Sequence, residues 1–365
     1  MTRYSMFTAM TLALTASLVA TPLLRGDAEP PLHWDHAIDV VGNFAKKGKD
    51  ATKASTDVSG LACAPASNNM RTCLAIDDEA LAAQLFTFDG TTIKTGDMIA
   101  LIDKASAASA FGTPPATTKC PDNDPDDKGD FKDIDGEGVA YDSAAAYFYI
   151  VGSHGCSRSK GKFSLASFIT ARVKVGDATA TQTTYRLADA LAKADPTTFG
   201  TKLGNKEAPT ADGMNVEGIV VSNGMMYVGL RAPSGVNNLL VGVEVAALFK
   251  PGDKPYDGKT TVMKLPLNAN EGVRDLSLLP DGRLLILTGP TREEDMVPYR
   301  LYVASLSDSA VTFSQPPVQI ELPEQGAKAE GVLPLDKVDG KLLVIIVFDG
   351  LANGKPHEYR VPLAN

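Results

Sequence analysis

The sequence lacks the residue patterns on which several common kinds of site depend. It has only four histidines and four cysteines, with no C-x-x-C motif and no cluster that combines the two residue types. Zinc coordination by such a cluster is therefore disfavoured. A Walker loop is missing, as is a glycine-rich dinucleotide fingerprint after an apolar strand. Because these motifs bind nucleotide phosphates, we expect no nucleotide cofactor.

Basic charge is also in short supply. The chain has 35 lysines and arginines against 44 aspartates and glutamates, a formal net charge of −9. A nucleic-acid surface needs clustered basic side chains that face the phosphates, so we expect no nucleic-acid partner.

Long apolar runs are absent except at the N-terminus, where residues 6–24 carry no charge before Arg25. A basic residue followed by such a run is typical of a signal peptide, which we place at residues 1–28 with cleavage near Ala20 or Ala28. A retained membrane anchor is the alternative, since about 20 apolar residues span a bilayer. Four threonines, a serine and a proline within the run favour export. We expect a periplasmic or secreted protein with no membrane span after cleavage.

An exported chain with an even number of cysteines is expected to form disulfides. Cys63 and Cys73 flank a turn-rich segment and fit neighbouring strands of one hairpin, whereas Cys120 and Cys156 lie in loop-like segments. The predicted pairs are Cys63–Cys73 and Cys120–Cys156.

About 335 residues remain after the signal, enough for one large all-β domain or two ordinary domains. Five segments within them resemble one another: a strand, a turn and a second strand. They are residues 57–79, 135–155, 215–235, 272–290 and 328–350. The turns "SNG", "PDG" and "VDG" are typical of β-hairpins.

Further strand-like runs follow these pairs, and four strands per repeat is the blade of a β-propeller. We therefore predict an all-β fold, a single propeller over residues 32–365 with five blades. Residues 37–44 supply the strand that closes the ring, since the last repeat is one strand short. Residues 104–133 and 187–214 are read as excursions, the second with a short helix, "LADALAKA". Six blades is the alternative, if an excursion holds a degenerate blade.

In a propeller, the starts of the innermost strands and the ends of the second strands gather at one mouth of the central channel. Across the repeats, the first position is held by Ser59, Glu137, Glu217, Arg274 and Glu330. The second position is held by Asp77 with Asp78, His154, Arg231, Gly289 and Asp349. The sequence therefore predicts a charged funnel.

Two interpretations of this funnel remain open. The charges around Arg274 can simply neutralise one another, because buried charges need partners. Alternatively the funnel is a binding site. Glu137, Glu217 and Glu330, helped by Asp275 and Asp349, are suited to Ca²⁺ or another divalent cation.

Basic residues of the funnel suggest a different ligand. Arg158, Arg231, Arg274 and His154 are suited to an anionic group, because guanidinium matches the geometry of phosphate and carboxylate. A cation and an anion site together would support metal-assisted hydrolysis of an ester.

Three short motifs are weaker candidates. The acidic run Asp122–Asp130 resembles a calcium loop but departs from the EF-hand pattern, so we interpret it as a solvated loop. His33 and His36 are two of only four histidines in the chain, so a metal role there is disfavoured. Ser153 and His154 are adjacent on a strand and so point to opposite faces, which means that they cannot readily pair as nucleophile and base. We expect His154 to point into the funnel.

The segments "DGEGVAYD", "YIVGSHGCSRSKGK", "NVEGIVVSNGMMYVGLRAP", "GVRDLSLLPDGRLLILTGP" and "AEGVLPL" resemble, in this order, the bacterial family of proteins of unknown function numbered 3616. The resemblance covers about residues 55–350 and implies a propeller, but no reaction. A more distant similarity is to exported phytase-like esterase domains, through Glu137, Glu217 and Glu330 alone. Ser59 stands where the first repeat would need Glu, so the acidic ring is incomplete.

These observations lead to one functional hypothesis and one alternative. The funnel binds, and as a phosphoesterase- or esterase-like hydrolase cleaves, a small anionic or ester ligand, with a divalent cation as the implied cofactor. The alternative is a non-enzymatic scaffold that presents residues 104–133 to a partner protein. We expect a monomer.

Overall fold

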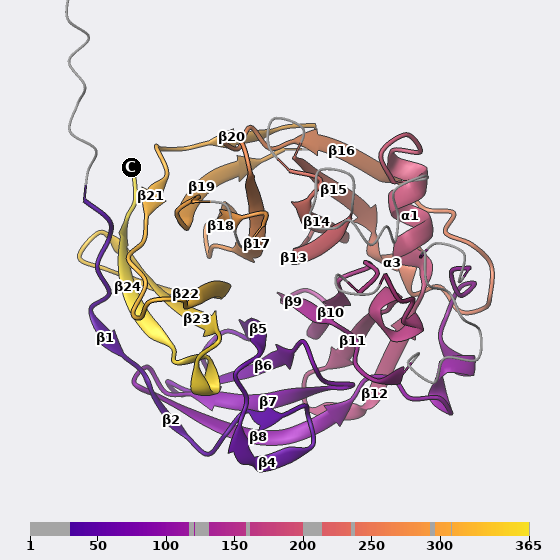
Figure 1. Ribbon diagram of the computed structural model, residues 1–365, viewed down its shortest axis with the longest axis horizontal. Helices are drawn as coiled ribbons and strands as arrows, with labels where there is room; N and C mark the ends of the chain where they lie inside the picture. The colour runs from indigo at the N-terminus through magenta and orange to yellow at the C-terminus, as the bar shows by residue number, and fades with distance from the viewer. Residues whose placement is uncertain are drawn as a thin grey trace, which may run out of the picture. The chain divides into compact units, whose positions relative to one another are not determined.

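The structure is a computed structural model that describes residues 30–116, 120, 131–157, 161–199, 214–234, 238–292, 296–307 and 309–364. Residues 31–365 form one compact unit, a β-propeller of five blades arranged around a central axis (Figure 1). The predicted fold class and the count of five blades are confirmed.

Each blade is an antiparallel sheet whose strands follow one another from the axis outward. Blade 1 contains β5 (Val58–Cys63), β6 (Arg71–Asp77), β7 (Ala82–Phe88) and β8 (Thr92–Ala100). Blade 2 contains β9 (Gly136–Asp142), β10 (Tyr147–Gly152), β11 (Thr170–Lys174) and β12 (Asp177–Thr184). Blade 3 contains β13 (Asn215–Ser222), β14 (Met225–Ala232), β15 (Leu239–Glu244) and β16 (Thr260–Lys264). Blade 4 contains β17 (Glu271–Leu278), β18 (Leu284–Pro290), β19 (Arg300–Leu306) and β20 (Val311–Phe313), with β21 (Val318–Gln319) also paired to β19.

Blade 5 closes the ring with a strand from the N-terminal side, as predicted. It contains β22 (Lys328–Val338), β23 (Lys341–Asp349), β24 (His357–Pro362) and the short β1 (His36–Ala37), which pairs antiparallel with β24. Closure uses less of the chain than the predicted 37–44. β2 (Asp39–Val41) instead joins blade 1, parallel to β8, and β3 (Ala45–Lys46) forms a separate pair with β4 (Asp50–Ala54).

The innermost strands β5, β9, β13, β17 and β22 each contact the next around the axis. Between every two neighbouring blades lies a buried apolar cluster, so each sheet is buried on both faces. Strand β10 illustrates the consequence: Phe148 and Ile150 pack toward blade 1, whereas Tyr149 and Val151 pack toward blade 3. Because successive side chains point to opposite faces, both sets must be apolar, which explains the unbroken run "YFYIV".

Two hairpin turns carry the left-handed residues that the sequence predicts. Asn223 and Gly224 have φ of 51° and 75°, and Asp339 and Gly340 have φ of 51° and 75°. These pairs match the positive φ that a two-residue hairpin turn requires at both central positions.

Within the described residues, two of the helical segments lie in or at the start of the excursions. Residues 104–133 contain a 3₁₀ turn at Ser106–Ser109, and the predicted helix is α1 (Arg186–Ala194). A 3₁₀ turn at Leu165–Phe168 precedes β11, α3 (Val245–Leu248) follows β15, and a 3₁₀ turn at Ala352–Gly354 precedes β24.

Both predicted disulfides are formed, Cys63–Cys73 across the β5–β6 hairpin and Cys120–Cys156 between the first excursion and blade 2. Disulfides of this kind fit an oxidising compartment. Among the helices of the described residues, none is long and apolar enough to cross a membrane. The predicted signal peptide, residues 1–28, lies outside the described residues.

Candidate functional site at the polar mouth of the channel

The repeated position at the start of each innermost strand is a β-bulge. In blade 1, Val58 pairs with Asp77 and Gly60 with Ile76, so Ser59 is an extra residue in the ladder. The register shifts in the same way in the other blades, at Glu137, at Glu217 with Gly218, at Arg274 and at Glu330. A bulge redirects a side chain without ending the strand. The sequence repeat therefore marks a fivefold structural feature next to the axis.

Glycines beside the bulges let neighbouring blades approach closely. A Cβ on Gly138 would lie 2.5 Å from the Glu217 carbonyl oxygen, and one on Gly60 would lie 2.6 Å from the Glu137 carbonyl oxygen. Only glycine fits where backbones of adjacent strands are this close.

The bulge residues of blades 3, 4 and 5 form a buried ion network. The Arg274 guanidinium donates through Nη2 to Glu330, and its Nη1 lies 3.8 Å from Glu217 Oε1. Arg231 Nη1 lies 3.4 Å from the same Glu217 oxygen and Arg231 Nε donates to the Thr291 carbonyl at 3.0 Å. The predicted self-neutralising arrangement around Arg274 is therefore present, and Arg231 belongs to it as well.

This network leaves some hydrogen-bonding capacity unused. Arg274 is 2% exposed, yet its Nε and Nη1 have no hydrogen-bond partner, and neither has Glu330 Oε2. Buried polar atoms of this kind are normally satisfied by protein, water or a ligand. The network is thus neutralised in charge but not saturated in hydrogen bonds.

Asp275 faces a backbone rather than the funnel. Its carboxylate accepts hydrogen bonds from the Leu276 amide at 2.8 Å and from the Val332 amide of blade 5 at 2.7 Å. Complete burial raises the pKa of Asp275 well above its usual range, against the effect of these two bonds. The residue joins blade 4 to blade 5.

A polar pocket of about 480 Å³ lies at this end of the innermost strands, between blades 1, 2 and 3. Glu137 of the β9 bulge, Asn215 at the start of β13 and Asp78 just after β6 all line it. The other ionisable side chains in its wall are Glu79, Lys132, Asp133 and Asp135. Five carboxyl groups therefore face one lysine.

Two of these carboxyl groups have strongly perturbed acidity. Burial, reinforced by the charges of Asp135, Asp57 and Asp77, raises the pKa of Asp78 to about 9. Burial, reinforced first by Glu217, raises the pKa of Glu137 well above its usual range, although Arg274 opposes this. At neutral pH Asp78 favours the protonated form and can donate a proton, and the pKa of Glu137 is shifted in the same direction. The charge of Glu217 also couples the pocket to the ion network.

Ser153, and not His154 as the sequence suggests, is the residue of this pair that lines the pocket. Ser153 lines the pocket, where its hydroxyl donates to Asp135 and accepts from the Gly155 amide at 3.2 Å. His154 is fully buried: Nδ1 lies 2.8 Å from the Gly152 carbonyl and the ring packs edge-on against Phe168. Burial lowers the pKa of His154 to about 4. The left-handed φ of 55° at this residue turns the side chain away from the pocket that Ser153 lines.

The remaining predicted residues lie elsewhere. Asp349 ends β23 and pairs with Lys328 at 3.2 Å. Arg158 and the acidic run Asp122–Asp130 lie outside the described residues. His33 is bonded to Glu321 at 2.8 Å and is exposed at the seam of the ring.

No group of three or more His, Cys, Asp or Glu in the described ranges is arranged to hold a metal ion. Glu217 and Glu330 are instead turned toward Arg274. The cation expected at Glu137, Glu217 and Glu330 stays a prediction.

Reasoning from the sequence missed Asp135, Ser153 and Asn215 as pocket residues. Asp135 has φ of 47°, and it precedes the "GEG" of the second repeat, where Asp tolerates a left-handed backbone. That "DG" step is the one signal in the sequence that marks it.

The family assignment is shown by sequence. The family model described as "Protein of unknown function (DUF3616)" matches residues 169–362, and the chain belongs to this family. The match begins at β11 and so covers the last part of blade 2 and blades 3 to 5. No curated protein matches the chain.

Solved structures with low sequence identity are also similar in fold. An α-L-arabinofuranosidase from Podospora anserina in complex with cellotriose has 11% identity and a TM-score of 0.44, with 90% of this chain and 96% of that chain covered. An α-L-arabinofuranosidase from Lactobacillus brevis has 12% identity and a TM-score of 0.44, with 85% and 92% covered. A thermostable family-43 glycoside hydrolase has 8% identity and a TM-score of 0.44, with 85% and 91% covered.

Proposed function

We propose that the protein binds a small polar ligand in the 480 Å³ pocket at the polar mouth of the channel, and that it hydrolyses an ester bond there by general acid catalysis. The observation that carries the proposal is the pair of carboxyl groups with raised pKa, Asp78 and Glu137, in one pocket. Strongly perturbed acidity inside a pocket is characteristic of functional sites.

The charges of the pocket favour a particular ligand class. Five carboxyl groups and one lysine line it, whereas the two arginines expected to bind an anion, Arg231 and Arg274, are engaged by Glu217 and Glu330. Even with Asp78 protonated, acidic side chains outnumber the one lysine, so an anionic ligand would meet repulsion. We therefore propose a neutral or cationic ester in place of the anionic ligand that the sequence suggests.

Side chains in the wall have distinct roles in this proposal. A water molecule attacks the carbonyl carbon and the acyl–oxygen bond breaks. A protonated Asp78 or Glu137 donates its proton to the leaving oxygen, and the resulting carboxylate takes up the proton that the attacking water loses. Ser153 is held by Asp135 and orients the ligand through its hydroxyl. Asn215, whose amide donates to Glu217 Oε1 at 2.6 Å, connects the pocket to the ion network.

The test compares three small esters that differ in charge: 4-nitrophenyl acetate, acetylcholine and monomethyl succinate. We expect hydrolysis of the neutral and cationic esters, weak or no hydrolysis of the anionic one, and loss of activity in Glu137→Gln, in Asp78→Asn or in both. Activity should fall as the pH rises through the pKa of the donor, because only the protonated acid donates. Glu324→Gln is the control, since Glu324 is exposed and pairs with Lys355. Equal rates for wild type, Glu137→Gln and Asp78→Asn would refute the proposal.

A divalent cation in the funnel is tested in the same preparation. Chelator-treated protein is titrated with Ca²⁺, Mg²⁺, Mn²⁺ and Zn²⁺ while the unfolding midpoint is recorded. A ligand that binds only the folded state raises the midpoint with its occupancy. A saturable rise that disappears in Glu217→Gln would support the cation, and no rise with any of the four metals would exclude it. The scaffold alternative involves residues 104–133, of which 117–119 and 121–130 lie outside the described residues.

A further inference from the structure

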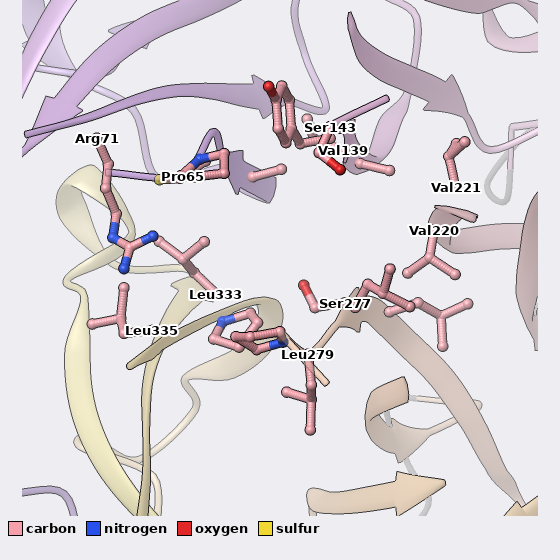
Figure 2. Close-up of a pocket in the computed structure, with 18 of the residues that line it drawn as sticks. Pro65, Arg71, Val139, Ser143, Val220, Val221, Ser277, Leu279, Leu333 and Leu335 are labelled. Carbon is pink, nitrogen blue, oxygen red and sulfur yellow. The ribbon is translucent and has the colours of Figure 1, made fainter. Parts of the chain in front are cut away.

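A second pocket, of about 620 Å³, lies at the opposite ends of the innermost strands (Figure 2). All five blades contribute to its wall, through residues such as Ala62, Val139, Val220, Leu276 and Leu333. The volume is within the range of small-molecule sites, which are concave and mostly apolar with a few placed polar groups. Its chemistry is unlike that of the acidic pocket at the other mouth.

The wall of this pocket contains one cationic side chain, Arg71. Figure 2 shows Arg71 on the same side of the cavity as Leu333 and Leu335. The Arg71 side chain is 16% exposed, and its Nη2 donates to Asp336 Oδ2 at 2.9 Å. An arginine has five N–H donors, and this bond uses one of them.

The partner of Arg71 is easily replaced. Asp336 has a side chain that is 78% exposed, so its ion pair with Arg71 is screened by water and contributes little to stability. A carboxylate brought by a ligand would meet the same guanidinium from the side of the apolar cavity. There it would be less hydrated and could accept two parallel hydrogen bonds.

Another polar side chain in the wall, Ser277, is already engaged. Its hydroxyl donates to the Val332 carbonyl at 2.7 Å. Tyr141 and Ser143 also line the pocket, but Arg71 is the one cationic side chain in its wall and so the group suited to select a carboxylate head. We propose that this pocket binds an aliphatic monocarboxylate, with the chain among the apolar side chains of the five blades and the carboxylate on Arg71 in place of Asp336. The proposal is independent of the function proposed for the acidic mouth.

The test measures the binding of octanoate and of 1-octanol by calorimetry. Octanoate should bind one molecule per chain and 1-octanol more weakly. Arg71→Gln should weaken octanoate by about tenfold, since a charge-assisted hydrogen bond is lost. Asp336→Asn should strengthen octanoate several-fold, because it removes the competing carboxylate. Neither substitution should change the binding of 1-octanol more than about twofold.

Two further variants separate this site from nonspecific binding. Ser143 is exposed and lines the pocket, so Ser143→Trp should obstruct it and weaken both ligands without disturbing the core. Arg360→Gln is the matched control, since Arg360 pairs with Asp35 and does not line the pocket. Each variant's unfolding midpoint reports whether it folds.

Three results would overturn the proposal. Octanoate binding that does not saturate, or that is unchanged in Ser143→Trp, would place the ligand elsewhere. Equal effects of Arg71→Gln on the binding of octanoate and of 1-octanol would show that the carboxylate of octanoate does not bind Arg71. A loss of octanoate binding in Asp336→Asn would show that Asp336 helps to hold the ligand rather than competing with it.

Discussion

Replacing Arg274 by Met tests whether the charges at the axis hold the ring together. Arg274 is 2% exposed and is the shared partner of Glu330 and Glu217, which come from blades 5 and 3. In Arg274→Met the apolar side chain fills much of the space, but Glu330 loses its cation. Glu217 keeps Arg231 at 3.4 Å and Asn215 at 2.6 Å, so most of the cost falls on Glu330.

Breaking a buried ion pair by removing one partner costs about 3–5 kcal/mol, because the remaining charge is buried without compensation. We expect a loss of about 3 kcal/mol in the free energy of unfolding at pH 7, the lower end of that range, because Glu330 can take up a proton. An unpaired buried carboxylate has a raised pKa in the folded state. The folded variant then binds more protons than its unfolded chain, so its deficit should shrink as the pH falls from 7 to 5.

The assay is urea unfolding followed by the fluorescence of Trp34, with the midpoint and slope giving the free energy. The double variant Arg274→Met with Glu330→Gln removes the isolated charge and should recover about half of the loss, since a neutral side chain is cheaper to bury than a charge. Arg360→Met, at a side chain that is 41% exposed, should cost less than about 1 kcal/mol. A cost below about 1 kcal/mol in Arg274→Met, or no recovery in the double variant, would refute the reasoning.

Three further predictions concern stability. The pKa of Asp78 is about 9 in the folded chain and 3.8 ordinarily, so between these pH values the folded chain binds one proton more than the unfolded chain. The free energy of unfolding should therefore fall as the pH rises from 5 to 9. The urea midpoint of Asp78→Asn should fall less over this range than that of the wild type. Gly138→Ala places a Cβ 2.5 Å from the Glu217 carbonyl and should lower the thermal midpoint far more than Gly96→Ala, where the nearest atom is 3.2 Å away; similar midpoints would contradict the close approach of the blades. Arg186 is 1% exposed and donates to five backbone carbonyls between residues 247 and 254. Arg186→Met should therefore lower the free energy of unfolding, measured in urea, by about 3 kcal/mol or more and make that segment susceptible to proteolysis. Unchanged proteolysis would show that the segment does not depend on Arg186.

Much of the fold could be predicted because its signals are local. Hairpin turns depend on a few adjacent residues such as Asn223 and Gly224, and strand pairs follow from short apolar runs. The closing strand was placed less well. β1 is only two residues long, and nothing in its composition shows that the following Asp39–Val41 joins β8 instead.

The site was predicted only in part. The repeat correctly marks Glu137, Glu217, Arg274 and Glu330 as axial positions, because a repeated bulge leaves a repeated residue type. The direction of His154 could not be read in the same way. A strand alternation argument fails at a residue with φ of 55°, where the chain has already left β10.

The sequence by itself determined the five repeats, the turns between their strands, both cysteine pairs and the charged positions near the axis. The turns and the Cys63–Cys73 pair depend on residues that are close in the chain, and the repeats and charged positions depend on a pattern repeated along it. Cys120 and Cys156 are the two cysteines that remain once the first pair is assigned. Only the tertiary structure decided which charges meet, that Ser153 and not His154 lines the acidic pocket, and that an apolar pocket with Arg71 lies at the other mouth. Those features are assembled from different blades, and their chemistry depends on distances and burial that arise only when the ring closes.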